Sequence, residues 1–200
     1  MDVVFDIGNV LLRWDPRNLY RAEFDSGDEM ERFLSGPLDM AFILQTDIAP
    51  SFAELIEQRV AAFPAYAREL RLFDARWPET LGGAIEENVA LLQRLKAGGA
   101  RVHALSNFAH EKFALACAQF PFLDAFDVAV ISGRERVAKP DRRIFEILVE
   151  RVGLPPSELL FVDDSLKNVE AARAFGIETL HYAPGLDLAR EFAARGLIAL

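Results

Sequence analysis

Three carboxylates follow apolar segments that are typical of buried β-strands. Asp6 closes the first such segment and is followed by Gly8-Asn9, which predicts an abrupt turn. Asp163 and Asp164 close a second apolar segment far along the chain. A carboxylate at the end of a buried strand is costly unless a partner binds it. If the two strands lie side by side, the carboxylates converge and require a cation, an arrangement typical of phosphoryl transfer.

Asp6 is the candidate nucleophile, because a carboxylate that attacks phosphorus splits one difficult displacement into two steps. Asp163 and Asp164 are the candidate metal ligands. Their side chains point to opposite sides of an extended backbone, so we expect one to bind the metal and the other to support it. Hard oxygen ligands favour Mg²⁺. The alternatives are a helix-cap or turn-forming role for Asp6 and a metal-free helix cap for the pair. Ser165 and Asn168 could cap the next helix or orient the carboxylates.

Two further positions could bind a phosphoryl group. Ser106-Asn107 follows a strand-like run and precedes a helix, where a hydroxyl and backbone N–H groups form a natural phosphate site. The same pair could simply cap that helix. Lys139 precedes Pro140, which disfavours a helical conformation, so its ammonium could project from a loop toward phosphate oxygens and the attacking carboxylate. The alternative for Lys139 is a solvated surface position.

No other pattern in the sequence predicts a competing chemistry. His103, His110 and His181 lack metal-ligand spacing, and the chain contains no P-loop, G-x-G-x-x-G, C-x-x-C or H-E-x-x-H motif. The single cysteine, Cys117, excludes an internal disulfide, which suits a reducing cytoplasm. The candidate chemistry therefore depends on carboxylates, one hydroxyl and one ammonium group.

The composition is typical of a soluble globular protein, with 52% hydrophobic and 26% charged residues. Two hundred residues suffice for one domain or for a core with an insertion. A net charge of −9 makes nucleic acids and anionic membranes poor partners. No apolar stretch reaches the roughly 18–20 residues that span a bilayer. We therefore expect a soluble, cytoplasmic protein that acts on a small molecule.

The elements that must position these residues alternate between strands and helices. Short apolar runs rich in β-branched residues predict strands, and helical periods separate them. This alternation predicts an α/β fold, with a three-layer, Rossmann-like core in which helices cover both faces of a parallel sheet. The expected strands are 3–6, 101–106, 127–132, 159–163 and 178–182, and the expected helices are 84–97, 110–119, 141–152, 166–175 and 186–195.

The interval from Arg13 to Gly83 interrupts this alternation because it contains no convincing strand. Asp15, followed by proline, predicts a helix start, and the segment that begins at Ser51 has capping-box spacing. We expect an all-helical cap domain over residues 14–83, inserted into a core of residues 1–13 and 84–200. The alternative is a long helical crossover within one domain, although roughly seventy residues far exceed a normal crossover.

The order of these signals resembles a known superfamily. Along the chain they are Asp6 after a strand, Ser106 after the next strand, Lys139 before a helix and Asp163-Asp164 after a later strand. This order resembles the haloacid dehalogenase-like hydrolases, and the resemblance covers the full length because that family inserts a helical cap at the same place. The opening F-D-I-G-N-V-L is most similar to the sugar-phosphatase branch that includes bacterial α-D-glucose-1-phosphate phosphatases.

The resemblance implies a catalytic role for three residues. Asp6 would be the nucleophile that accepts the phosphoryl group, Ser106 would bind that group, and Lys139 would offset its charge. The residues expected to contact the substrate are Gly8, Asn9, Ser106, Asn107 and Lys139.

The resemblance also implies a Mg²⁺ site. Asp6, the Gly8 carbonyl and Asp164 would hold the ion, with Asp163 close by. Mg²⁺ is therefore the expected cofactor.

One departure from the family pattern concerns Gly8. Phosphatases of this superfamily usually carry an aspartate two residues after the nucleophile, as general acid and base. Gly8 cannot pass a proton to a leaving alkoxide, and such proton transfer is commonly worth about 10²- to 10⁴-fold in rate. The substrate could have a good leaving group, such as an anomeric sugar hydroxyl. Otherwise Asp15, His110 or water could replace the missing acid, or the protein could be slow or inert.

The sequence therefore predicts a Mg²⁺-dependent phosphatase that hydrolyses a small phosphorylated metabolite, with a sugar phosphate favoured, through an aspartyl-phosphate intermediate. The cap would close over the substrate and exclude water. One alternative is a metal-independent 2-haloacid dehalogenase, which needs no acid at Gly8 but whose carboxylate substrate the acidic pair would repel. The other is a catalytically weak protein that binds sugar phosphate.

Overall fold

The computed structural model describes residues 1–199 and confirms the predicted α/β fold. One sheet of five parallel strands has the order β5-β4-β1-β6-β7. Its strands are β1 (Asp2–Phe5), β4 (Val102–Ser106), β5 (Val128–Ile131), β6 (Leu159–Asp163) and β7 (Glu178–His181). Each coincides closely with a predicted strand. Because β1 lies at the centre of the sheet, it pairs with both β4 and β6.

Helices follow the strands of this sheet. Their bounds are α6 (Glu86–Ala97), α7 (His110–Gln119), α8 (Ser132–Glu135), α9 (Arg142–Val152), α10 (Leu166–Phe175) and α11 (Leu188–Ala194). No helix within residues 1–199 is both long and apolar enough to cross a membrane.

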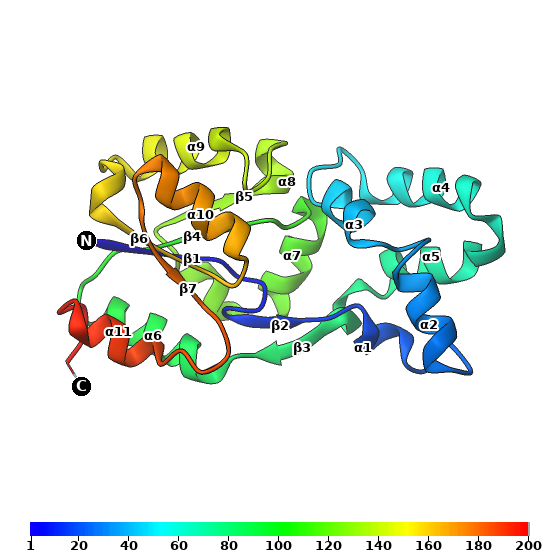
Figure 1. Ribbon diagram of the computed structural model, residues 1–200, viewed down its shortest axis with the longest axis horizontal. Coiled ribbons are helices and arrows are strands. Elements are labelled where there is room, and N and C mark those ends of the chain that lie inside the picture. The colour runs from blue at the N-terminus through cyan, green and yellow to red at the C-terminus, as the bar shows by residue number, and fades with distance from the viewer. Residues whose placement is uncertain (200) are drawn as a thin grey trace.

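Both faces of the sheet are covered because alternate strand residues point to opposite sides. Val3 and Phe5 of β1 share a hydrophobic core with α6 and α11, whereas Val4 packs with α9 and α10. Figure 1 shows α9 and α10 above the sheet and α6 and α11 below it. The three central strands, β1, β4 and β6, are therefore buried on both faces, and their carboxyl ends are available for polar chemistry.

The prediction of no strand between Arg13 and Gly83 is wrong at both ends of the interval. β2 (Leu12–Trp14) and β3 (Leu81–Ala84) form a two-stranded antiparallel sheet. Neither strand has a recognisable apolar period, and Gly82 and Gly83 are residues that strands usually avoid. Pairing between two chain segments that are distant in sequence creates these strands. The chain therefore leaves the five-stranded core and returns to it through two strands, β2 and β3, that run side by side.

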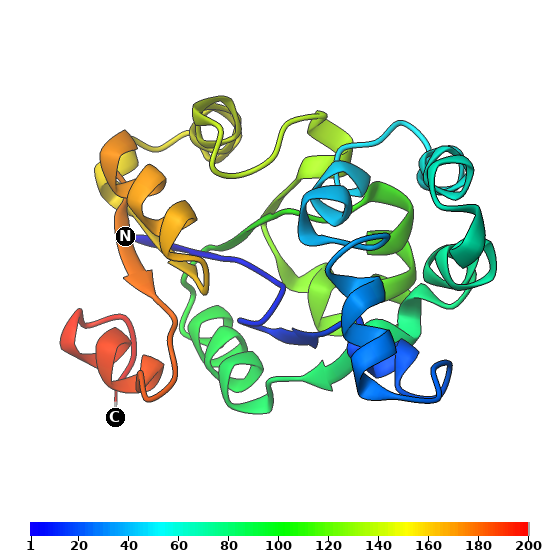
Figure 2. The same ribbon diagram turned by 45° about the vertical axis from the view of Figure 1, so that its right-hand side comes forward.

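The segment between β2 and β3 is helical, and it lies beside the carboxyl ends of the sheet strands in both views (Figures 1 and 2). Asp15 accepts a hydrogen bond from the Arg17 N–H at 2.9 Å, and Ser51 accepts one from the Glu54 N–H at 3.2 Å. Both predicted helix starts are therefore present. The helices are α1 (Arg17–Tyr20), α2 (Gly27–Leu34), α3 (Met40–Thr46), α4 (Phe52–Ala62) and α5 (Ala67–Ala75).

Aromatic side chains dominate the packing of this helical segment. The Tyr20 and Phe33 rings lie 4.8 Å apart between centroids, and the Phe24 ring lies 5.3 Å from that of Phe33. The same hydrophobic cluster continues into residues of the sheet and α7, including Ala104 and Phe113. This packing holds the segment against the edge of the sheet where the polar strand ends lie.

Candidate active site

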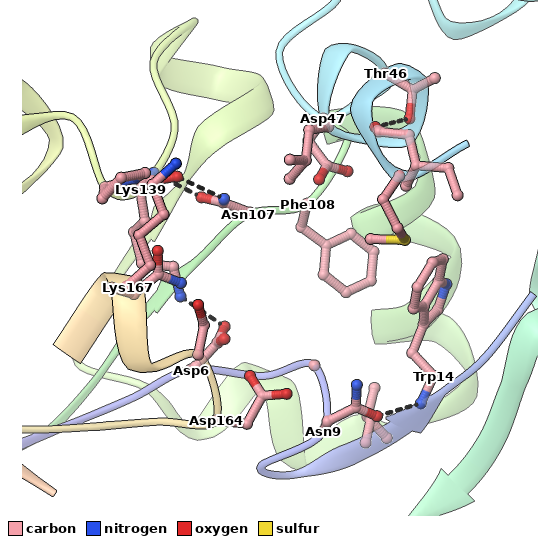
Figure 3. A pocket seen from close by; sticks show the side chains of 18 of the residues that line it. Asp6, Asn9, Trp14, Thr46, Asp47, Asn107, Phe108, Lys139, Asp164 and Lys167 are labelled. Carbon is pink, nitrogen blue, oxygen red and sulfur yellow. Dashed lines mark hydrogen bonds and ion pairs between the residues drawn. The ribbon is translucent and has the colours of Figure 1, made fainter. Parts of the chain in front are cut away.

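The structure brings Asp6, Asp163 and Asp164 together at the carboxyl edge of the sheet. One carboxylate oxygen of each residue lies within 4.8 Å of the other two. β1 and β6 are hydrogen-bonded neighbours, which is why residues so distant in sequence converge. Figure 3 shows Asp6 and Asp164 on the same side of a pocket, below Lys139. The convergence on which a shared cation depends is therefore present.

Hydrogen bonds hold one oxygen of the Asp6 carboxylate. Oδ1 accepts from the Ile7 N–H and the Ser106 hydroxyl, both at 2.7 Å, and lies 3.0 Å from Lys139 Nζ. Among the described residues, no hydrogen bond ends on Oδ2. The side chain is buried but lines the pocket. Asp6 thus has a fixed orientation and one oxygen that can attack a substrate or bind a cation.

Lys139 is a buried cation. Its Nζ lies 2.6 Å from Oδ2 of Asp163 and 3.0 Å from Oδ1 of Asp6, and it donates to the Leu105 carbonyl at 2.8 Å. Burial alone would lower the pKa of Lys139, but the charges of Asp163 and Asp6 outweigh burial and raise that pKa. The ammonium therefore remains charged, and the alternative of a solvated surface lysine is excluded.

The adjacent acids Asp163 and Asp164 have different environments. Asp163 is fully buried, and its Oδ1 accepts from the Ser165 N–H at 2.7 Å. Its Oδ2 pairs with Lys139, and the Asn168 amide donates to both oxygens at 3.2 Å. Asp164 is only partly buried and lines the pocket. Asp164 is therefore better placed than Asp163 to offer an oxygen to a cation.

The loop after β4 fixes the position of Lys139. Oδ1 of Asn107 accepts from the Lys139 N–H at 2.8 Å, and its Nδ2 donates to the Lys139 carbonyl at 3.0 Å. The Asn107 amide is thus occupied by the main chain of another loop, although the residue still lines the pocket. The Phe108 N–H donates to Ser132 Oγ at 2.8 Å. One of the backbone donors expected for a phosphate is therefore already used.

A close approach of two backbones stabilises this loop. A Cβ at Gly133 would lie 2.3 Å from the His110 nitrogen and 2.8 Å from the Phe108 carbonyl oxygen. Only glycine allows this contact, and its N–H donates to the Phe108 carbonyl at 3.1 Å. The segment after β5 therefore supports the loop that follows Ser106.

Gly8 and Asn9 form the turn after β1. Asn9 has a φ of 53°, a left-handed conformation that asparagine adopts more readily than most residues. Its Oδ1 accepts from the Trp14 N–H at 3.0 Å, which ties the turn to β2. Within residues 1–199, no hydrogen bond ends on the Gly8 carbonyl. A Cβ at Gly8 would meet no heavy atom within 4 Å. The carbonyl can serve as a ligand, and a side chain at this position would have space.

The carboxylates of this site are costly to ionise without a cation. Burial raises the pKa of Asp6 to about 7, a shift that the charge of Lys139 opposes and that of Asp163 increases. Burial, followed by the charge of Asp163, also raises the pKa of Asp164. A divalent ion would favour both ionised forms. The donor set consists of hard oxygen atoms, which fits Mg²⁺.

The carboxylates open into a cavity of about 340 Å³ that has one polar and one apolar side. The polar side consists mainly of residues from the ends of the sheet strands. Most of the apolar side comes from the helical segment and the strands that flank it. Apart from Pro140, the apolar lining residues are Leu12, Trp14, Met40, Ile43, Leu44, Phe73, Trp77, Leu81 and Phe108.

Asp47 is a cavity residue that no pattern in the sequence indicates. It follows α3, and its side chain points into the pocket opposite Asp6 (Figure 3). Burial raises the pKa of Asp47 to about 7, and the charge of Asp6 adds to this shift, whereas Lys139 and the Ala109 N–H oppose it. No local signal marks Asp47, because it ends no predicted strand and belongs to no motif. Only the packing of α3 over the edge of the sheet brings it to the site.

Two residues considered as substitutes for the missing acid lie elsewhere. The Asp15 carboxylate accepts a hydrogen bond from the Arg17 N–H at the start of α1 and pairs with the Arg17 guanidinium at 3.4 Å. Nδ1 of His110 accepts from Arg134 Nε at 3.2 Å in an exposed position. Neither residue is among the described residues that line this cavity. Neither is therefore placed to protonate a group bound beside Asp6.

Known proteins similar to this chain include a phosphatase and a dehalogenase. A sesquiterpene phosphatase from Aspergillus oryzae is 27% identical over 197 residues, which cover 94% of this chain and 92% of the relative. An (S)-2-haloacid dehalogenase from Pseudomonas sp. strain CBS-3 is 30% identical over 97 residues, which cover 48% of this chain and 43% of the relative. The relatives of this chain therefore include enzymes named for both of the reactions considered from the sequence.

A similar fold occurs in a solved structure that contains a metal and phosphate. The haloacid dehalogenase-like (HAD) family enzyme from Bacteroides thetaiotaomicron, crystallised with magnesium and inorganic phosphate, is 26% identical to this chain with a TM-score of 0.72. The match covers 96% of this chain and 98% of that one. A model of the haloacid dehalogenase-like hydrolase family matches residues 3–176. The predicted superfamily is confirmed, and the chain belongs to the haloacid dehalogenase-like hydrolases.

Proposed function

We propose that this hydrolase is a Mg²⁺-dependent phosphatase that cleaves a small phosphate monoester through an aspartyl-phosphate on Asp6. The observation that carries the proposal is the geometry of Asp6, whose Oδ1 is held by three donors while Oδ2 accepts no described hydrogen bond. Lys139 and Asp164 flank this carboxylate at the wall of a cavity. The magnesium and phosphate bound by the Bacteroides enzyme support the same chemistry.

The reaction would take two displacements at phosphorus. In the first, a carboxylate oxygen of Asp6 bonds to phosphorus, and the bond from phosphorus to the alcohol oxygen breaks. In the second, a water oxygen bonds to phosphorus, and inorganic phosphate leaves Asp6. Ser106 keeps the carboxylate oriented, and the charge of Lys139 favours its ionised form and offsets charge on the transferring group.

The metal would be held by Asp6, Asp164 and the Gly8 carbonyl, with Asp163 supporting the site through Lys139. When bound, Mg²⁺ offsets the negative charge of the phosphoryl oxygens. The clustered carboxylates and their raised pKa values support this assignment, because they indicate a site that gains from a divalent cation.

Substitution of the two adjacent acids should separate their roles. Asp164→Asn should raise the Mg²⁺ concentration for half-maximal activity at least about tenfold, because it removes a ligand charge. Asp163→Asn should change that concentration less but lower the free energy of unfolding by about 2–4 kcal/mol, because it removes a buried partner of Lys139. Mg²⁺ titrations of activity and urea denaturation measure the two effects. Equal loss of Mg²⁺ affinity in both variants would contradict the assignment.

The cavity walls favour a substrate whose alcohol part is apolar. A sugar, favoured by the sequence, presents hydroxyl groups that need partners, but Trp14, Phe73 and Trp77 offer mainly apolar surface. Met40 and Leu44 also line the cavity and are exposed by 54% and 45%. The Aspergillus relative is named for a sesquiterpene substrate, which agrees with such walls. We therefore place phosphates of apolar alcohols ahead of sugar phosphates.

Phosphate release from a panel of esters tests the proposed function. With Mg²⁺, n-octyl phosphate should be hydrolysed with a kcat/KM at least about tenfold above that of glucose 1-phosphate, since each buried methylene contributes about 0.8 kcal/mol. A chelator should lower both rates at least about 10²-fold.

Other results would point to other functions. A higher kcat/KM for glucose 1-phosphate would favour a sugar phosphatase. Chelator-insensitive halide release from 2-chloropropionate would indicate a dehalogenase. Binding of sugar phosphate without any phosphate release would indicate a binding protein.

A further inference from the structure

Cleavage of an alkyl phosphate requires a proton for the leaving oxygen. An alkoxide is a strong base, and Gly8 offers no acid beside the nucleophile. If the proposed function holds, another group must supply this proton from within the cavity. The described residues with titratable side chains in its lining are Asp6, Asp47, Lys139, Asp164 and Lys167.

Four of these five groups already have another role or are poorly placed to donate the proton. Asp6 attacks phosphorus and must be ionised, and Asp164 faces the cation site. Lys139 is bound to two carboxylates that stabilise its charged form. Lys167 is an exposed residue. Asp47 is the remaining acid, and it lies on the opposite wall of the pocket from Asp6 (Figure 3).

We propose that Asp47 is the general acid and general base of this phosphatase, supplied by the helical segment in place of a residue at Gly8. In the first step its carboxyl proton moves to the leaving oxygen as the phosphorus–oxygen bond breaks. In the second step the resulting carboxylate takes a proton from the water that attacks phosphorus. Asp47 then carries its proton again, so the cycle is balanced.

The backbone around Asp47 is hydrogen-bonded to the segment that follows β5 of the five-stranded sheet. The Ser132 hydroxyl donates to the Asp47 carbonyl at 2.9 Å, and Ser132 is fully buried. The Arg136 guanidinium donates to the carbonyls of Ile48, at 3.2 Å, and Ala49. Three consecutive carbonyls are therefore held by residues that follow β5. These bonds place the Asp47 side chain at a defined position over the site.

A structural role does not account for this acid. Asp47 caps the C-terminal end of α3, where a negative charge is disfavoured by the helix dipole. Its carboxylate forms no ion pair with any residue in the range 1–199. An ionisable group that has no ionic partner, accepts a backbone N–H from Ala109, and is partly buried and directed into a cavity fits a functional role better than a purely structural one.

The electrostatic environment suits both halves of the cycle. Burial and the charge of Asp6 raise the pKa of Asp47 to about 7, against the opposing effects of Lys139 and the Ala109 N–H. Asp164 and Lys167 also face the same cavity. An acid with a pKa near neutrality exists in both protonation states at working pH, which is the best compromise for donating and accepting a proton.

The test compares two esters in the first turnover of Asp47→Asn, with Mg²⁺ present. 4-Nitrophenyl phosphate releases a stable phenolate without protonation, whereas n-octyl phosphate does not. We expect the first-turnover rate for n-octyl phosphate to fall at least about 10²-fold, and that for 4-nitrophenyl phosphate to fall less than about fivefold. Nitrophenolate should then appear as a burst of one equivalent, because the second step has lost its base.

A matched control and a rescue sharpen this test. Asp15→Asn removes an acid of the same segment that lies outside the cavity lining, and the asparagine oxygen can still accept from the Arg17 N–H, so both rates should stay within about twofold of the wild type. Adding Gly8→Asp to Asp47→Asn should restore part of the n-octyl phosphate rate, because a side chain has space there.

Three results would contradict the role of Asp47. Equal slowing of both esters would indicate a structural residue, and an unchanged n-octyl phosphate rate would place the acid elsewhere. If the wild type released phosphate from neither ester, the proposed function would fail, and the role of Asp47 with it. Only in this last case would the control variant Asp15→Asn also lack activity.

Discussion

Asp6→Asn should lower the rate of phosphate release at least about 10⁴-fold while making the metal-free protein more stable. Activity falls because the amide cannot form the proposed phosphorylated intermediate. Stability rises because the wild type holds a carboxylate that is costly to ionise, close to two other acids. At pH 8 in a chelator, the free energy of unfolding should rise by about 1–3 kcal/mol.

The gain in stability should depend on pH in a defined direction. The pKa of Asp6 rises from an ordinary 3.8 to about 7 on folding, so the folded protein binds this proton more tightly. Its contribution to stability is therefore complete below 3.8 and is lost as the pH rises through 7. Asp6→Asn lacks this titration. Its free energy of unfolding should therefore exceed that of the wild type by an amount that grows between pH 3.8 and pH 7. Urea denaturation at pH 4, 6 and 8 measures the difference.

A second aspartate on β1 provides the control for Asp6. Asp2 lies at the other end of the strand and pairs with Arg101 at 2.8 Å. Asp2→Asn should leave the rate of phosphate release within about twofold of the wild type. Substantial activity in Asp6→Asn would exclude Asp6 as the nucleophile. If Asp6→Asn were less stable than the wild type in a chelator, Lys139 would be shown to compensate the Asp6 carboxylate of the wild type well.

Lys139→Met should destabilise the metal-free protein by about 3–5 kcal/mol and reduce activity at least about 10²-fold. The lysine is the buried counter-charge of both Asp6 and Asp163, and methionine retains its bulk but not its charge. Near-normal folding, expected if the lysine projected from a solvated loop, is not consistent with this burial. Mg²⁺ should restore part of the lost stability, because the ion offsets the same carboxylates.

Lys112 is a matched control for this experiment. It is also buried, and it pairs with Asp74 outside the cavity. Lys112→Met should be less stable than the wild type, and Mg²⁺ should not restore this loss. The folded fraction of this variant should release phosphate at the wild-type rate. Thermal melting with Mg²⁺ and with a chelator, followed by assays on folded protein, distinguishes the two variants. If Mg²⁺ failed to stabilise Lys139→Met more than Lys112→Met, the coupling between lysine and metal would be refuted.

The sequence alone determined the sheet and the carboxylates that meet at its edge. Buried parallel strands have continuous apolar runs, and the polar residues at their carboxyl ends must lie on one side of the sheet. Asp6, Ser106 and Asp163 could therefore be placed together by local patterns. The order of these signals was specific enough to indicate the family. The strands β2 and β3 escaped prediction because their pairing, rather than their composition, forms them.

Only the tertiary structure decided what surrounds these carboxylates. It showed that Asp163 is occupied by Lys139 and Asn168 while Asp164 faces the cavity. It also showed that the walls are mainly apolar and that Asp47 reaches the site from α3. These properties arise where two distant segments of chain pack against each other. Periodicity reports which face of an element is buried but not which side chains it meets there, so the proposed nucleophile was predictable and the proposed acid was not.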